Sequence, residues 1–227
     1  MKNWGKLIMS RISSTESDGI QKYNDYFKGL YNRNKKFLII SAAFYFLALF
    51  IGLLIGYFLP SSIEPFLLSI IRTDRMFVRQ NGISTLSILT HNLYSVFLTY
   101  AGGIIGIITA AILFLNGFTY GSFLGYLSSN HQIASTIGNV TPALYIIYTV
   151  PHGVFEITGF IIAGAAGFRL TIAIVDMLRS DSLVSDHYWE FKDSLALLGI
   201  SIVFIIIAAI IEANITLHLG NYITHLL

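Results

Sequence analysis

Three ionisable side chains lie inside stretches of this sequence that otherwise carry no charge. His152 and Glu156 follow Pro151 in one apolar stretch, and Glu212 lies near the end of another. Residues four apart share one face of a helix, with Cβ atoms roughly 5–6 Å apart, so His152 and Glu156 can pair. A carboxylate in lipid needs a partner or a water-filled cavity. This set could bind a proton or a divalent cation, or it could be a hydrogen-bonded structural contact between helices.

Three further polar residues, His91, Asn92 and Asn116, occur within or beside apolar stretches and are candidates for the same polar centre. A metal site is not predicted, because one histidine with two carboxylates far apart in the sequence is a weak ligand pattern. The chain has no cysteine, which excludes disulfides and thiolate chemistry. Since the sequence has neither a catalytic triad nor a phosphate-binding glycine loop, it predicts no catalytic residues, no cofactor and no enzyme activity.

Proline and glycine indicate where the apolar stretches break or pack closely. Pro151 and Gly153 are expected to divide one stretch into a half-helix over 142–150 and a span over 152–175, with His152 capping the second helix. Asn116 and Gly117 are expected to interrupt another. Small residues at regular helical spacing favour close packing between helices. The glycines expected to serve packing are Gly117, Gly121, Gly164 and Gly167.

The composition is that of an integral membrane protein. The 227 residues are 55% hydrophobic and only 11% charged, against roughly 25% charged in soluble domains, and the mean hydropathy is +0.70. Apolar runs long enough to cross a hydrocarbon core of roughly 30 Å predict about five spans. These runs cover residues 37–59, 89–115, 118–127 with their flanks, 152–175 and 194–217.

The fold class predicted is therefore all-α, a polytopic membrane helical bundle with about five spans and broken or re-entrant helices. The segment Asn116–Leu127 is too short to cross alone, so the sequence leaves open whether it spans or re-enters. One compact bundle is expected rather than two domains: a transmembrane helical domain over residues 37–227, preceded by a cytosolic, basic, amphipathic arm over residues 1–36. The arm is either a helix on the membrane surface or a frayed tail.

Charge predicts the orientation in the membrane. Eight of the 14 lysines and arginines precede residue 37, which places the amino terminus in the cytoplasm by the positive-inside rule. An odd number of spans then places the carboxy terminus outside, and the plasma membrane is the expected location. Arg169 near the inner end of a span is expected to snorkel and fix the topology. The basic arm suits lipid headgroups better than nucleic acid.

A set of motifs between about residue 90 and residue 216 points to a known family. They are Asn92-Leu93, Gly106, Asn116-Gly117 with Gly121, Pro151-His152-Gly153 with Glu156, Gly164, Gly167-Phe168-Arg169-Leu170 and Ile211-Glu212. With these motifs the chain resembles the stage II sporulation protein M family of multispanning membrane proteins.

The resemblance implies a non-enzymatic role. In spore formers the founding member acts with the two peptidoglycan-degrading sporulation proteins D and P during engulfment, so the resemblance implies a membrane component of an envelope or membrane-remodelling assembly. Its partners would be membrane lipids and other proteins of that assembly. A homodimer is compatible with the small-residue faces, although these serve intramolecular packing equally well. The alternative is a channel or transporter with an ion- or proton-binding site at His152, Glu156 and Glu212.

Overall fold

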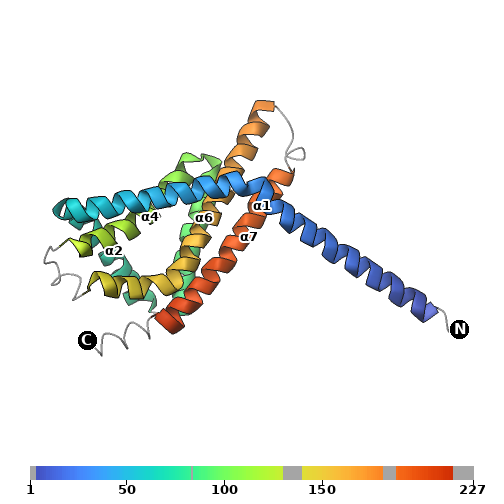
Figure 1. Ribbon diagram of the computed structural model, residues 1–227, viewed down its shortest axis with the longest axis horizontal. Coiled ribbons are helices and arrows are strands. Elements are labelled where there is room, and N and C mark those ends of the chain that lie inside the picture. The colour runs from blue at the N-terminus through green and yellow to red at the C-terminus, as the bar shows by residue number, and fades with distance from the viewer. Residues whose placement is uncertain (1–3, 83, 130–139, 181–187, 217–227) are drawn as a thin grey trace. The chain divides into compact units, whose positions relative to one another are not determined.

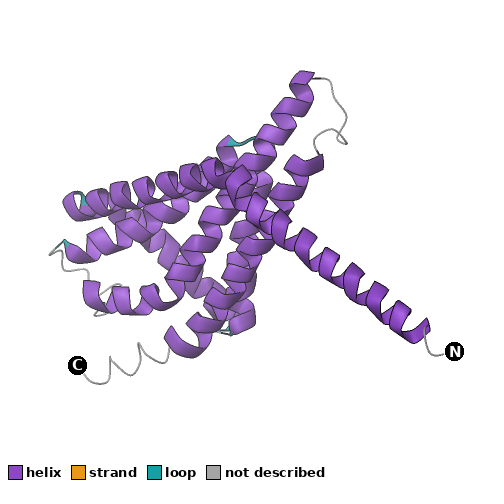
Figure 2. Cartoon of the chain, turned by 45° about the vertical axis from the view of Figure 1, so that its right-hand side comes forward, coloured by secondary structure: helices purple, strands orange, loops and turns teal. Residues whose placement is uncertain are grey.

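Every described element of the chain is a helix (Figures 1 and 2). The structure, a computed structural model, describes residues 4–82, 84–129, 140–180 and 188–216, and only the backbone of residues 4–23. The chain divides into two compact units, residues 1–36 and residues 37–227. The elements are α1 (Trp4–Phe58), α2 (Pro60–Asn81), α3 (Thr85–Ala101), η1 (Gly102–Ile104), α4 (Ile107–Ser128), α6 (Pro142–Ser180), α7 (Tyr188–Ile211) and η3 (Glu212–Thr216).

Local sequence accounts for where several helices begin. The Ser84 side chain accepts from the Ser87 backbone N–H and the Ser87 side chain accepts from that of Ser84, a reciprocal cap that starts α3. α6 begins at Pro142, where a missing N–H costs nothing, and the Thr141 hydroxyl accepts from the Leu144 backbone N–H at 3.2 Å.

Four of the described helices are long and apolar enough to cross a membrane: Asn24–Phe58 within α1, α4, Pro142–Arg179 within α6, and Tyr188–Thr216 across α7 and η3. The prediction of an all-α membrane bundle is confirmed. α3 has 17 residues and falls just below this length. The segment that follows the first predicted span contains the 22-residue helix α2.

The predicted span over 89–115 is wrong. The chain reverses inside it, between α3 and α4, where Gly106 has a φ of 76° that only glycine adopts without strain. The Thr171 hydroxyl of α6 donates to the Gly103 carbonyl at 2.7 Å, which satisfies a group at the helix end. These glycines therefore make a turn, rather than the smooth face of one long helix.

The two predicted helix breaks are also absent. Asn116 and Gly117 lie in the middle of α4, which runs without interruption, and the Asn116 amide donates to the Ile112 carbonyl one turn earlier. The segment Asn116–Leu127 thus belongs to a candidate span. Pro151 and Gly153 lie inside the continuous helix α6. Proline bends α6 instead of ending it, and Figure 1 shows the first, yellow part of α6 set at an angle to the rest.

α1 and α4 pack in parallel through glycines. The Gly117 backbone meets the Tyr45 carbonyl, Gly121 meets Leu49 and Gly125 meets Leu53, so both helices advance together by one turn at each contact. Because each glycine faces backbone, the two helices approach more closely than any side chain would permit. Gly117 and Gly121, two of the glycines expected to serve packing, both lie in this contact.

The directions in which the helices run determine which helix ends lie together. α6 and α7 are antiparallel, since the Ser194 hydroxyl donates to the Ala166 carbonyl and the Ser201 hydroxyl donates to the Gly159 carbonyl. α3 must return the chain between α1 and α4, because these two helices run the same way. The return brings the start of α3 beside the last turns of α7 and the first half of α6.

A methyl group at residue 121 tests the α1–α4 contact. We expect Gly121→Ala to lower the free energy of unfolding by about 1–3 kcal/mol, since the added Cβ would overlap the Leu49 carbonyl oxygen and neither backbone can move away. Thermal unfolding of purified protein in detergent measures the effect. Gly199→Ala in α7 is the matched control, because nothing lies within 4 Å of a Cβ there. Equal Tm values for the two variants would contradict the contact.

Candidate functional site

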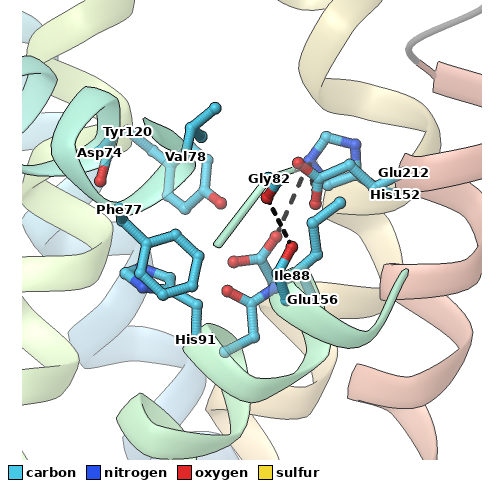
Figure 3. Close-up of a pocket in the computed structure, with 12 residues that line it drawn as sticks. Asp74, Phe77, Val78, Gly82, Ile88, His91, Tyr120, His152, Glu156 and Glu212 are labelled. Atoms are coloured by element: carbon cyan, nitrogen blue, oxygen red, sulfur yellow. Dashed lines mark hydrogen bonds and ion pairs between the residues drawn. The ribbon is translucent and has the colours of Figure 1, made fainter. Parts of the chain in front are cut away.

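His152, Glu156 and Glu212 converge at one place in the bundle (Figure 3). The His152 Nε2 atom lies 3.8 Å from a Glu156 carboxylate oxygen and 3.9 Å from a Glu212 carboxylate oxygen. One ligand atom from each of the three residues lies within 4.8 Å of the other two. His152 and Glu156 are each only 7% exposed, whereas Glu212 is partly exposed. We call these three residues the His–Glu–Glu cluster.

Two features of the fold bring Glu212 to the other two residues. His152 and Glu156 are one turn apart on α6, and the antiparallel packing of α7 on α6 carries the end of α7 to the same level. There η3 widens the helix into a π-turn, a form often found at functional sites. In this turn both Glu212 and Thr216 reach His152, the latter with its hydroxyl 3.3 Å from Nδ1.

Hydroxyl groups surround the cluster. Thr216 is 1% exposed, so its contact with His152 excludes bulk water. The Tyr120 hydroxyl of α4 lies within hydrogen-bonding reach of the Glu156 carboxylate. The Tyr145 hydroxyl in turn lies 3.5 Å from the Tyr120 carbonyl and ties the first part of α6 to α4. These contacts fix both the imidazole ring and one carboxylate.

Two adjoining cavities meet at the cluster, one of about 400 Å³ and one of about 650 Å³. Both are lined by Asp74, His91, Asn92, Tyr120, His152 and Glu156. Glu212 lines the smaller cavity, whereas Asn116 and several tyrosines line the larger one. A cavity that holds ionisable side chains at the meeting point of several helices is a common form of ligand site in a helical membrane protein.

Among the described residues, the cavity lining holds more acidic than basic groups. Among the described residues that line the two cavities, the ionisable groups are carboxylates, histidines and tyrosines, with no lysine or arginine. Asp74 of α2 and His91 of α3 are exposed and stand where the cavities reach the surface. The His91 ring lies 5.0 Å from the Phe77 ring, opposite the cluster in Figure 3. This lining attracts cations and repels anions.

The other residues predicted from the sequence lie in the cavity lining, at helix contacts or far from the cluster. His91 and Asn92 line both cavities and Asn116 lines the larger one. Gly164 faces Leu113 and Ser41, while Gly167 faces Thr109. Arg169 lies nearly five turns beyond His152 on α6 and pairs with Glu190 at 3.9 Å. Arg169 is therefore remote from the cluster, and its role in topology stays a prediction.

Sequence reasoning missed Asp74, Tyr120 and Thr216. Asp74 lies in a charged segment that reads as a surface connection, and only the position of α2 brings it to the cavity. Thr216 could have been noticed, because it lies four residues after Glu212 at the end of the same apolar run. Tyr120 carries no sequence signal that separates it from the other tyrosines.

The cluster has the donor set of a cation site. One imidazole nitrogen and two carboxylates can bind a divalent metal, and the same three groups could be a proton site. The sequence predicted no metal site, because it could not give the distance between Glu212 and His152. That distance, 3.9 Å, brings the carboxylate close to a ring nitrogen that is free to bind.

Apolar membrane-length helices around a polar cavity define this chain as a polytopic α-helical membrane protein. It belongs to the stage II sporulation protein M family, whose model matches residues 38–217. The chain is also 36% identical over 138 residues to an uncharacterized protein of Methanocaldococcus jannaschii, a match that covers 60% of this chain and 73% of the relative. No solved structure matches the chain. The resemblance drawn from the motifs is confirmed, and the match also includes the apolar part of α1.

The absence of cysteine from the chain permits a direct test of the cavity. Ser95 lines the larger cavity and is half-buried. We expect Ser95→Cys to react with a small, positively charged methanethiosulfonate in membranes, because water and cations enter the cavity. Ser122→Cys is the control, since Ser122 is fully buried and lines neither cavity. Equal protection of both thiols in the folded protein, with both reacting in detergent-unfolded protein, would contradict an open cavity.

Proposed function

We propose that this chain is a non-enzymatic transporter that binds a small cation at the His–Glu–Glu cluster and moves it across the membrane. The observation that carries the proposal is the polar cavity lined by carboxylates and histidines inside a bundle of apolar helices. Ionisable residues at membrane depth are costly and usually belong to ion or substrate pathways.

The cavity lining supports a cation as the substrate. Asp74 and His91 stand at the mouth, and the His–Glu–Glu cluster lies further in. A cation that enters would therefore pass from an exposed carboxylate to two deeper ones. Oriented oxygen atoms from Tyr120 and Asn92 can replace part of its hydration shell on the way.

Polar groups continue from the cluster into the core along α1. Tyr45 is fully buried with no hydrogen-bond partner for its hydroxyl, and it interacts electrostatically with Glu156. Ser41, one turn earlier on α1, is also fully buried, and its hydroxyl has no partner either. Two unsatisfied hydroxyl groups one turn apart are suited to ordered water or to a passing cation.

Close packing favours alternating access over an open pore. Beyond this point a Cβ on Gly167 would overlap the Thr109 side chain, and one on Gly103 would overlap the Gly167 backbone. The Arg169–Glu190 pair lies at the far end of α6. A cation can cross only if these contacts rearrange, which is the behaviour of a transporter rather than of a permanently open channel.

Cation flux into proteoliposomes tests the proposal. We expect wild-type protein to move protons or metal cations and expect Glu156→Gln and Glu212→Gln to lose roughly tenfold or more of the rate, because the amide keeps the shape but not the charge. Glu64→Gln is the control, since Glu64 lines neither cavity. The Tm of each variant is measured in parallel. Absence of flux from wild type would refute transport, and loss of rate only through unfolding would refute the role of the two carboxylates.

We propose that the protein lies in the plasma membrane with its amino terminus in the cytoplasm. The bias of lysine and arginine toward residues 1–36 supports this orientation. The cluster near the end of α7 would then open to the outside. An impermeant reagent added to intact cells should label Ser95→Cys. Labelling that occurs only in inverted vesicles would indicate the opposite orientation.

A second candidate function follows from the family. Membership supports a role as a membrane component of an envelope or membrane-remodelling assembly, with lipids and other membrane proteins as partners. The exposed apolar side chains on α1 and α3, such as Phe50 and Phe97, would face lipid or such a partner.

Crosslinking in native membranes tests this second function. We expect a thiol crosslinker on Phe97→Cys, an exposed position on α3, to trap a defined partner or a second copy of this chain. The buried Ser122→Cys is the control for non-specific crosslinking. If only lipid adducts and monomers are recovered at native expression, the assembly role loses its support.

A further inference from the structure

We propose that the His–Glu–Glu cluster is a binding site for one divalent first-row transition metal ion, with Zn²⁺ as the representative. The ligands are His152 Nε2 and one carboxylate oxygen each from Glu156 and Glu212. This proposal names the cation class for the transport function proposed above and rests on that function only for the movement of the metal.

The geometry of the cluster is close to that of a bound site. Ligand atoms about 2.0–2.1 Å from a tetrahedral Zn²⁺ lie about 3.3 Å from one another. The two nitrogen–oxygen distances in the cluster are 3.8 and 3.9 Å. Small rotations of the two glutamate side chains close this gap, and the helices need not move.

A hydrogen bond to Thr216 orients the His152 ring for metal binding. With its proton on Nδ1, His152 donates to the Thr216 hydroxyl, and the Nε2 lone pair then faces both carboxylates. Metal-binding histidines usually make such a bond through the other ring nitrogen, which fixes the ring and its tautomer. Tyr120 supports Glu156 in the same way.

Charge favours a divalent ion. Two carboxylates together neutralise one M²⁺, and a neutral site is the least costly in surroundings of low dielectric constant. No lysine or arginine lines the cavities among the described residues, so no side chain there competes for the carboxylates. In the absence of a cation, the two carboxylates repel each other.

Ligand type selects among divalent ions. Ca²⁺ and Mg²⁺ prefer oxygen ligands alone, whereas imidazole suits Zn²⁺, Fe²⁺, Co²⁺ and Ni²⁺. The soft ion Cu⁺ prefers thiolate or thioether, and no cysteine or methionine lines either cavity among the described residues. Three protein ligands leave at least one coordination position, which faces the cavity. The ion can therefore exchange, unlike one in a closed structural site.

Equilibrium dialysis of the purified full-length protein against Zn²⁺ tests the site. We expect one tightly bound Zn²⁺ per chain, and we expect His152→Gln and Glu212→Gln each to weaken binding by at least the roughly 10- to 100-fold that follows from losing a hydrogen-bonding partner of a ligand. Glu64→Gln is the matched control, because Glu64 lines neither cavity. X-ray absorption of the bound metal should show one imidazole and carboxylate oxygen ligands.

The outcomes separate this proposal from the transport function. Stoichiometric Zn²⁺ binding that His152→Gln and Glu212→Gln both abolish, without flux, would support the site and refute transport. Proton or monovalent cation flux with no Zn²⁺ binding would support transport and overturn the metal site. Equal Zn²⁺ binding by wild type and both variants would also overturn it, since the metal would then be held elsewhere. If His152→Gln fails to fold, Glu212→Gln alone decides, because Glu212 is partly exposed and its amide variant keeps the shape.

Discussion

A carboxylate enclosed by apolar helices must be neutralised or hydrated, and much of this structure follows from that constraint. Glu156 is 7% exposed, and the groups around it come from several separate elements: a histidine on its own helix, a second carboxylate and a hydroxyl at the end of α7, and a tyrosine from α4. The cavity exists because these polar groups cannot be packed as hydrocarbon. The π-turn at the end of α7 adds two of these polar groups, because it directs both Glu212 and Thr216 at the His152 ring.

Glycine shapes this bundle in two different ways, by close helix contact and by reversal of the chain. Along α1 and α4, Gly117, Gly121 and Gly125 let backbone touch backbone, which locks a long parallel pair. At the junction of α3 and α4, Gly106 instead permits a positive φ, and the chain reverses within a few residues. The first use fixes the wall of the cavity that carries Tyr120. The second use creates α3 as a separate helix, which brings His91 and Asn92 to the cavity lining.

The sequence was informative where a property depends on residues close together in the chain. The pairing of His152 with Glu156 follows from helical spacing, and the apolar lengths predicted the membrane helices. Predictions failed where local signals conflict with packing. Pro151 breaks an isolated helix, yet α6 continues through it, and Asn116 satisfies its own amide inside α4. The reversal at Gly106 was missed because a glycine that turns the chain looks the same in sequence as one that packs. No local pattern could bring Glu212 or Asp74 to the cavity, since both arrive through the arrangement of whole helices.

The parallel contact between α1 and α4 also bears on how the protein is made. Chain growth delivers α1 to the membrane well before α4, because Gly121 follows Leu49 only after α2, α3 and the turn at Gly106 have been synthesised. During this interval the face of α1 that will contact α4 lacks its native partner. Native pairing must then form between segments far apart in the chain, and such long-range contacts slow folding. The return helix α3 thus decides the order of biogenesis, since α4 can meet α1 in parallel only after α3 has brought the chain back.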